Sequence, residues 1–127
     1  MFVEGIPEVI SQAAPATSDE IASVEKILKL KFPEELRLLL SEANGVEANL
    51  VQFYSCEDMP ERNETYEVAE YAPGYILFGV VNSFPVLVKE GNVSAVYEND
   101  WGAMTPDCME LLAPSLKEWI NKGCPDT

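Results

Sequence analysis

The sequence predicts an α+β fold, with an antiparallel sheet of about four to six strands and helices packed mainly on one face. Two amphipathic patterns of helical spacing lie between residues 17 and 45, and strand-like patterns joined by short turns follow between residues 51 and 97. Consecutive strands joined by short turns pair antiparallel, and a run of such strands beside separate helices is typical of the α+β class. No repeat or linker divides the 127 residues, so we expect a single domain over 1–127.

The first 15 residues predict a short helix that Pro15 ends. Pro7 suits the first turn of such a helix. Apolar side chains recur at helical spacing around it, at Ile6, Val9, Ile10 and Ala13.

The next helix has a clear start signal. Thr17 and Glu20 have the spacing of a capping box, in which the Thr17 hydroxyl accepts from the Glu20 amide and the Glu20 side chain reaches back. The helix should end near Lys29, because lysines complement the negative end of the helix dipole. One face of this helix carries its apolar side chains, Ile21, Val24, Ile27 and Leu28.

A second helix should follow at once and form a helical hairpin with the first. Pro33 suits its first position, and Asn44-Gly45 supplies a left-handed exit at its end. Its apolar stripe consists of Leu36, Leu39, Leu40 and Ala43.

After residue 45 the apolar period changes from helical to alternating, which predicts strands. We expect them at residues 51–55, 75–81, 84–89 and 93–97. Pro73-Gly74 predicts a turn, and Gly91-Asn92 predicts a type II′ hairpin turn. Residues 98–112 predict an irregular loop with one or two short turns.

A last helix can open at Pro114 and stop at Gly123. Leu116, Trp119 and Ile120 should face inward from it, so Trp119 is expected in the core. Trp101 lies in a polar loop, where exposure and burial are both plausible, and an exposed tryptophan there would be a binding anchor. Three phenylalanines on the strands are expected in the core: Phe53, Phe78 and Phe84.

The charge of the chain is unusual, with 22 acids, 8 bases and a formal net charge of -14. Direct binding of nucleic acid is disfavoured, because phosphates require a basic surface. An anionic membrane would repel the chain for the same reason. A basic protein partner would instead be attracted, although the acidity could also serve only solubility.

Several catalytic classes are excluded by composition. The chain has no histidine, so Ser-His-Asp and Cys-His arrangements are impossible. No nucleotide-binding or zinc-protease motif occurs, and no pair of carboxylates is singled out for glycosidase-type chemistry. Residues 98–102 have oxygen ligands but lack the EF-hand spacing, so a surface turn is expected. We therefore expect no enzyme activity, cofactor or metal.

The cysteines and the N-terminus indicate a cytoplasmic protein. Cys56, Cys108 and Cys124 are odd in number, widely spaced and without a CxxC, so free thiols are expected. The N-terminus lacks the basic and apolar regions of a secretion signal. No apolar run approaches the roughly 20 residues that span a bilayer.

Residues 57–70 form the most acidic stretch, and they could be a loop or a short helix. Between residues 38 and 88 Arg62 is the only base among eight acids, which accounts for half of the net charge of -14. The stretch could be a solvated face, or a surface that docks a basic partner, with tyrosines as anchors if they are not in the core. The candidate partner-binding residues are Tyr54, Glu57, Asp58, Glu61, Glu64, Glu67, Glu70, Tyr71, Asp100 and Trp101.

The order of these signals resembles the SUKH superfamily. Its opening pattern is a capped helix, a Leu-Gly-x-x-Leu-Pro step, a second helix and an Asn-Gly end, and residues 17–45 are similar to it. The step here is residues 28–33, with Lys29 and Phe32 in place of the usual Gly and Leu. Further matching segments are Asn63-Glu64, residues 71–74, Phe78-Gly79 and residues 113–120. The glycine-rich turn often found after Phe-Gly is absent from residues 80–84.

This resemblance implies an α+β domain without catalytic residues. Bacterial members are often immunity proteins that bind and neutralise toxin domains, many of them nucleases, and some fungal relatives regulate cell-wall synthesis through partners. We therefore expect a protein-binding domain that blocks a basic toxin domain by occlusion. The alternatives are an intracellular regulator or scaffold of the same fold and, less favoured, a small-ligand binder or enzyme with a pocket beneath the sheet.

Overall fold

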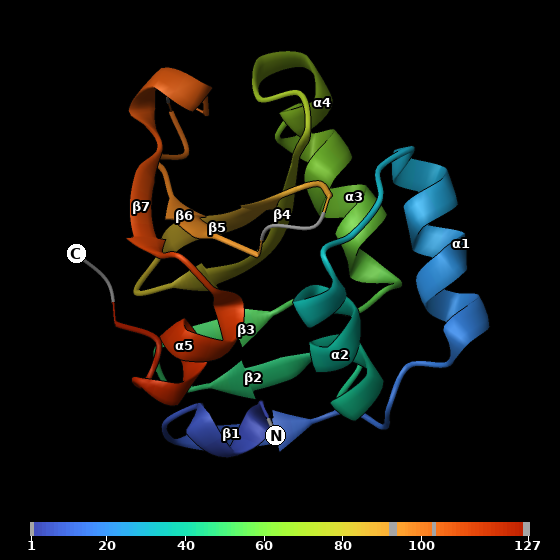
Figure 1. Cartoon of the computed structure of the whole chain (residues 1–127), viewed down its shortest axis with the longest axis vertical. Coiled ribbons are helices and arrows are strands. Elements are labelled where there is room, and N and C mark those ends of the chain that lie inside the picture. Colours follow the sequence, from blue (N-terminus) through green and yellow to red (C-terminus); the bar gives the residue numbers. More distant parts are fainter. Residues whose placement is uncertain (1, 92–93, 103, 126–127) are drawn as a thin grey trace.

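The computed structural model describes residues 2–91, 94–102 and 104–125. In this part of the chain seven strands form one antiparallel sheet, in which each strand lies beside the next along the sequence (Figure 1). The strands are β1 (Val9–Gln12), β2 (Val46–Ala48), β3 (Val51–Phe53), β4 (Tyr75–Val81), β5 (Phe84–Lys89), β6 (Val96–Glu98) and β7 (Glu110–Ala113). The helices are α1 (Ser18–Leu28), α2 (Glu34–Glu42), α3 (Asp58–Thr65), α4 (Val68–Tyr71) and α5 (Leu116–Asn121), with short 3-10 turns at Val3–Gly5 and Pro106–Cys108.

The α+β class with an antiparallel sheet is confirmed, but the predicted number of strands is too low. The three missed strands are β1, β2 and β7, each only three or four residues long. Residues 98–112, predicted as an irregular loop, contain β7, which pairs with β6. Such short strands have too few alternating positions to be recognised, and pairing with a neighbour decides them.

The predicted N-terminal helix is wrong. Residues 9–12 instead form edge strand β1, with Val9 opposite Ala48 and Gln12 opposite Val46. All four residues of β1 are exposed, so the strand has no buried face that the sequence could reveal. An isolated helix this short is marginal in water, and pairing with β2 supplies hydrogen bonds that the helix cannot match.

Helix α1 begins as predicted, with Thr17 and Glu20 in a capping box. The Glu20 amide donates to Thr17 Oγ1 at 3.1 Å, and the Thr17 amide donates to Glu20 Oε1 at 2.9 Å. The helix ends at Lys29, which is left-handed with φ 58°. Ile27, predicted on the apolar face, is 61% exposed.

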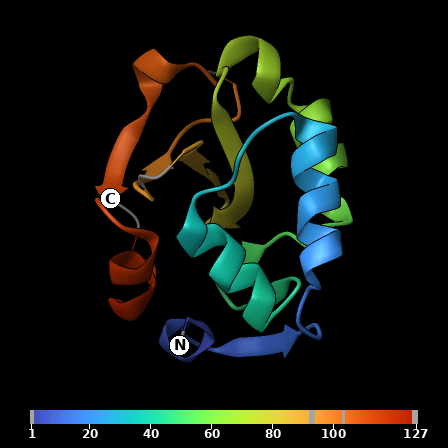
Figure 2. The same ribbon diagram turned by 45° about the vertical axis from the view of Figure 1, so that its right-hand side comes forward.

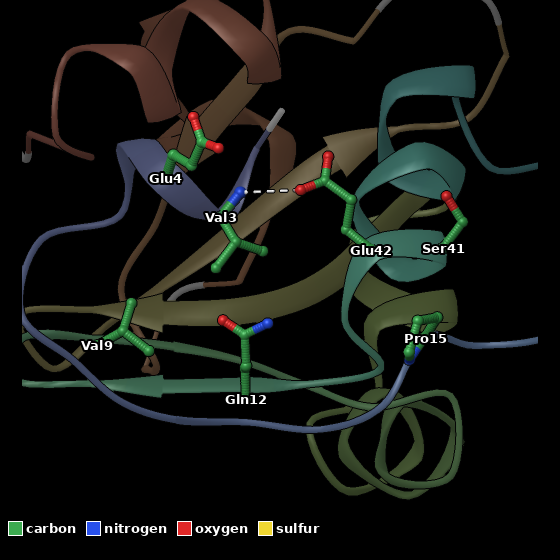
Figure 3. Close-up of a pocket in the computed structure, with 7 residues that line it drawn as sticks. All are labelled: Val3, Glu4, Val9, Gln12, Pro15, Ser41 and Glu42. Carbon is green, nitrogen blue, oxygen red and sulfur yellow. Dashed lines mark hydrogen bonds between the residues drawn. The ribbon is translucent and has the colours of Figure 1, made fainter.

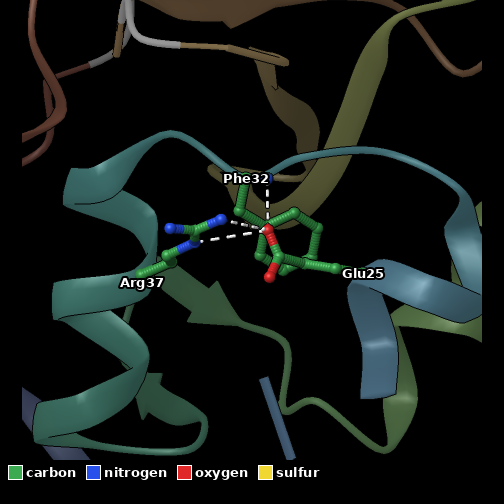
Figure 4. A network of polar contacts seen from close by, with 3 residues as sticks. All are labelled: Glu25, Phe32 and Arg37. Atoms are coloured by element: carbon green, nitrogen blue, oxygen red, sulfur yellow. Dashed lines mark hydrogen bonds and ion pairs between the residues drawn. The ribbon is translucent and has the colours of Figure 1, made fainter. Parts of the chain in front are cut away.

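One carboxylate ties the α1–α2 hairpin together (Figure 4). Glu25 Oε2 accepts from the Phe32 amide at 2.7 Å and from Arg37 Nη2 at 2.8 Å. The contact joins the last turns of α1, the connecting segment and the first turn of α2, so it sets the angle of the hairpin.

Helix α2 keeps its predicted apolar stripe, but its ends differ from the prediction. Pro33 precedes the helix as its N-cap, and the helix ends at Ala43 in an extended conformation. The left-handed residue is Gly45, with φ 109°. Asn44 is not left-handed, and its side chain accepts the Cys56 amide at 2.7 Å, which anchors the chain after β3.

The core lies between the sheet and the helices, which cover mainly one face. Trp119 of α5 is fully buried, and its ring lies 6.0 Å from that of Phe53 and 6.5 Å from that of Phe78. In Figures 1 and 2, α2 and α5 lie beside the β1–β3 part of the sheet, while α1 runs alongside α3. Phe84, expected in the core, is 42% exposed, and it starts β5 directly after the two-residue turn that follows β4.

The last helix starts at Leu116, two residues later than expected. Ser115, not Pro114, is its N-cap, and Ser115 Oγ accepts the Glu118 amide at 3.2 Å. Leu116 and Ile120 are buried as predicted, and Gly123 follows the helix with φ 88°. The predicted turn at Gly91-Asn92 includes residue 92, which lies outside the described residues, as does Val93.

The side chain of Asn63 closes the edge of β4 beyond the end of β3. The Tyr54 amide makes the last bond from the β3 side, to the Phe78 carbonyl at 2.9 Å. The next residue, Leu77, donates its amide to Asn63 Oδ1 at 3.0 Å and accepts from Asn63 Nδ2 at 3.0 Å. Asn63 is only 6% exposed, and it also donates to the Met59 carbonyl at 2.8 Å. The amide therefore takes the place of a neighbouring strand and holds α3 against β4.

Asn63→Ala should lower the free energy of unfolding by about 2–3 kcal/mol, because it leaves the buried peptide groups of Leu77 without partners. Urea unfolding followed by circular dichroism measures the loss. Asn49→Ala is the matched control, since its amide makes an exposed contact with Glu8 at 3.2 Å, and it should cost less than about 1 kcal/mol. Equal losses in the two variants would contradict this role for Asn63.

Candidate protein-binding site

The acidic stretch folds into two short helices rather than a loop. The Asp58 amide donates to Ser55 Oγ at 3.1 Å, which supports the first turn of α3. Asp58 and Glu61 then lie in that first turn, where carboxylates stabilise the positive end of the helix dipole. Met59 and Asn63 face the core from the same helix. The spacing of the acids therefore leaves them on the outer side of α3.

We call the exposed carboxylates of this region the α3–α4 acidic surface. Every member is exposed to solvent, and the members come from α3, α4 and the residues that precede each helix. They are Glu57, Asp58, Glu61, Glu64, Glu67 and Glu70. The structure thus brings six of the sequence-predicted residues together on one pair of helices.

The one base in this segment, Arg62, is already engaged. Its Nε lies 3.5 Å from Glu61 Oε2, and its guanidinium carbon lies 5.8 Å from the centre of the Tyr54 ring. Tyr54 is 5% exposed, so its ring belongs to the core beneath the surface. Burial raises the pKa of the Tyr54 phenol, and the charge of Arg62 opposes part of that rise.

Two of the carboxylates lie in an unfavourable arrangement. Glu67 adopts a left-handed conformation, with φ 52°, between α3 and α4. A side-chain hydrogen bond with Glu70 raises the pKa of Glu67, and the negative charge of Glu70 raises it further. Left-handed backbone has a steric cost for a residue other than glycine, and neighbouring like charges oppose each other's ionisation.

The predicted aromatic residues are placed in different ways. Trp101 is half-buried: its ring lies 4.5 Å from that of Tyr66, and its Nε1 donates to the Ser83 carbonyl at 2.8 Å. The ring contact holds the loop after β6 against the segment that joins α3 and α4, and the hydrogen bond holds it against the turn between β4 and β5. Tyr71 ends α4 and is 50% exposed, which leaves its ring available for contact.

The surface turn expected at residues 98–102 is only partly correct: Asp100 is exposed and a turn follows it, but Glu98 ends β6 and both Glu98 and Asn99 are buried. Asp100 Oδ1 accepts the Gly102 amide at 2.9 Å, and its own amide donates to Asn99 Oδ1 at 2.8 Å. Among the described residues no group of three or more His, Cys, Asp or Glu side chains could hold a metal ion.

A cavity of about 600 Å³ lies far from these residues in the sequence, between the N-terminal segment and α2 (Figure 3). Its carboxylate Glu42 accepts from the amides of Phe2, at 2.7 Å, and Val3, at 3.2 Å. Figure 3 shows Glu4 on the other side of Val3 from Glu42, so the two carboxylates do not converge on one point. Glu42 anchors the N-terminal turn.

Sequence reasoning missed a groove beside the acidic surface. It lies between α1 and α3, and Ile27 and Pro60 line it together with Glu57. The acidic residues at the start of α1 are the one signal for this groove in the sequence. The helical spacing of Ile27 instead predicts that its side chain faces the core.

The three thiols differ in environment. Cys108 is exposed, whereas Cys56 and Cys124 are buried, and all three are free. Burial, followed by the charge of Glu20, raises the pKa of Cys56 to about 11, and burial raises the pKa of Cys124 to about 12. Both buried thiols therefore stay protonated at neutral pH.

These features together define an α+β protein with a meandering antiparallel sheet and an acidic helical surface. Residues 15–122 match the SMI1 / KNR4 family (SUKH-1), and the chain belongs to this family. The match confirms the resemblance seen in the helical hairpin and the closing helix, and the family includes immunity proteins. No curated protein matches the chain. None of the helices in the described residues combines the length and apolar character that crossing a bilayer requires.

Near pH 8 we expect a disulfide reagent such as DTNB to label Cys108 rapidly and the other two cysteines slowly, because the thiolate is the reacting species. Cys108→Ser should abolish the fast phase, and guanidinium should expose the remaining thiols. Absorbance at the wavelength of the released thiolate measures the stoichiometry. A fast phase that survives in Cys108→Ser would show that the buried thiols are accessible.

Proposed function

We propose that this chain is a protein-binding domain that neutralises a basic toxin domain, possessing no catalytic activity of its own and acting in the cytoplasm. The observation that carries the proposal is the α3–α4 acidic surface, which has six exposed carboxylates. The one base in this segment, Arg62, already lies beside Glu61. Membership of a family that includes immunity proteins supports the same function.

The electrostatics favour a basic protein partner. The substrate groove of a nuclease must be basic to bind phosphates, so a surface rich in carboxylates complements it. A formal net charge of -14 would also steer the encounter over a distance of about one Debye length. Occupation of the groove would block the substrate without any chemical step.

A regulator or scaffold of the same fold is the second candidate, because the family that matches is named after SMI1 and KNR4 and is not confined to immunity proteins. Such a protein would bind a cellular partner that is not toxic. Gene neighbourhood and co-expression with the neighbouring toxin gene separate the two functions, since only an immunity protein restores growth.

The variant Glu64→Lys, Glu67→Lys, Glu70→Lys should slow association with the toxin domain encoded beside this gene by about tenfold at low salt and flatten the salt dependence. Stopped-flow association rates over a series of salt concentrations provide the measurement. Its matched control is Glu4→Lys, Glu47→Lys, Glu118→Lys, which makes the same change in net charge on exposed positions of other elements.

The control decides between a local and a global effect of charge. If both triple variants slow association equally, net charge alone steers the partner and the α3–α4 acidic surface is not the interface. If the wild-type protein neither binds the toxin domain nor protects cells from it, the immunity function is wrong.

A further inference from the structure

Helices α1 and α3 lie side by side (Figure 2). A groove of about 530 Å³ runs between them. Its floor is apolar, because Val24 and Cys56 line it and are 1% and 8% exposed. Ile27 of α1 and Pro60 of α3 form its apolar walls. The groove therefore offers an apolar surface that no described segment of the chain covers.

Ile27 is the distinctive residue of this groove. Its side chain is 61% exposed, whereas the side chains of Ile21 and Val24 on the same helix are buried. Single exposed aliphatic residues are common on protein surfaces and need no explanation alone. Ile27 differs because it lies in a hollow with a second apolar wall, and such a hollow can receive a side chain from a partner.

The charged residues that line the groove are all acidic: Asp19, Glu20 and Glu57. Glu57 also belongs to the α3–α4 acidic surface, so the groove continues that surface toward α1. Burial and, after it, the negative charge of Glu20 raise the pKa of the Cys56 thiol. The electrostatic field of Glu20 therefore reaches the floor of the groove. An occupant must therefore combine an apolar group with positive charge.

We propose that this groove is the anchor point for the basic partner, and that it receives a segment in which one apolar side chain is flanked by Lys or Arg. The apolar side chain packs between Ile27 and Pro60 over Val24, and the flanking cations pair with Asp19 and Glu57. The inference rests on the proposed function and names the part of the surface that supplies binding energy in addition to charge.

Physical reasons favour this occupant over a second copy of the chain. In a symmetric dimer through the groove, the carboxylates of one rim would face those of the other, and like charges in contact oppose association. A partner segment with positive charges is attracted to these carboxylates instead of being repelled by them. Apolar burial then slows dissociation, while the acidic surface beside the groove accelerates association.

Ile27→Lys tests the groove, because it adds positive charge where the partner's cation must approach and removes the apolar wall. Leu111→Lys is the matched control: it makes the same chemical change on β7, at a side chain that is 57% exposed. Affinity for the toxin domain encoded beside this gene is measured by calorimetry for wild type and both variants. Ile27→Lys should weaken binding by about tenfold or more, and Leu111→Lys by less than about twofold. Thermal unfolding of each variant verifies that the fold is intact.

The outcomes separate the groove from the function. If all three proteins bind the toxin domain equally, the groove is not the anchor, while the immunity function stands. If the wild-type protein does not bind it, the proposed function fails and the groove loses its partner. Sedimentation velocity of the chain alone completes the test, since a dimer that Ile27→Lys dissociates would assign the groove to a second copy and overturn the proposal.

Discussion

The pairing of Asn63 with Leu77 is the contact on which the rest of the acidic region depends. Strand β3 is too short to cover the whole edge of β4, and the Asn63 amide supplies both the donor and the acceptor that a further strand residue would have supplied. Because the amide is buried and also bonds the Met59 carbonyl, it fixes the position and the rotation of α3. This contact on the inner side of α3 therefore also determines which way the carboxylates on its outer side point.

Buried contacts and exposed charges therefore lie on opposite sides of one helix. The inner side of α3 has a fully buried methionine and a hydrogen-bonded asparagine, and its outer side has carboxylates with one engaged arginine. Substitutions on the outer side can change charge with little effect on the core.

Helix α1 has a comparable division between a side that joins α2 and a side that borders the groove. Glu25 binds the Phe32 amide and Arg37 on one side, which joins α1 to α2 (Figure 4). On the side toward α3, Asp19 and Ile27 border the groove instead. The same hairpin thus presents acidic and apolar groups next to the α3–α4 acidic surface.

The sequence by itself determined the capped helices, the central strands β4 and β5, the burial of Trp119 and the acidic segment. These features arise from local signals, such as the Thr17–Glu20 capping box and the period of the apolar residues, which act over a few positions. The tertiary structure alone decided the rest. Strands β1, β2 and β7 exist through pairing with distant segments, and Phe84 and Ile27 are exposed because no element covers them. Trp101 contacts Tyr66, and Ile27 lines the same groove as Pro60, only in the folded chain. Residues far apart in sequence that come together in this way leave no periodic signal.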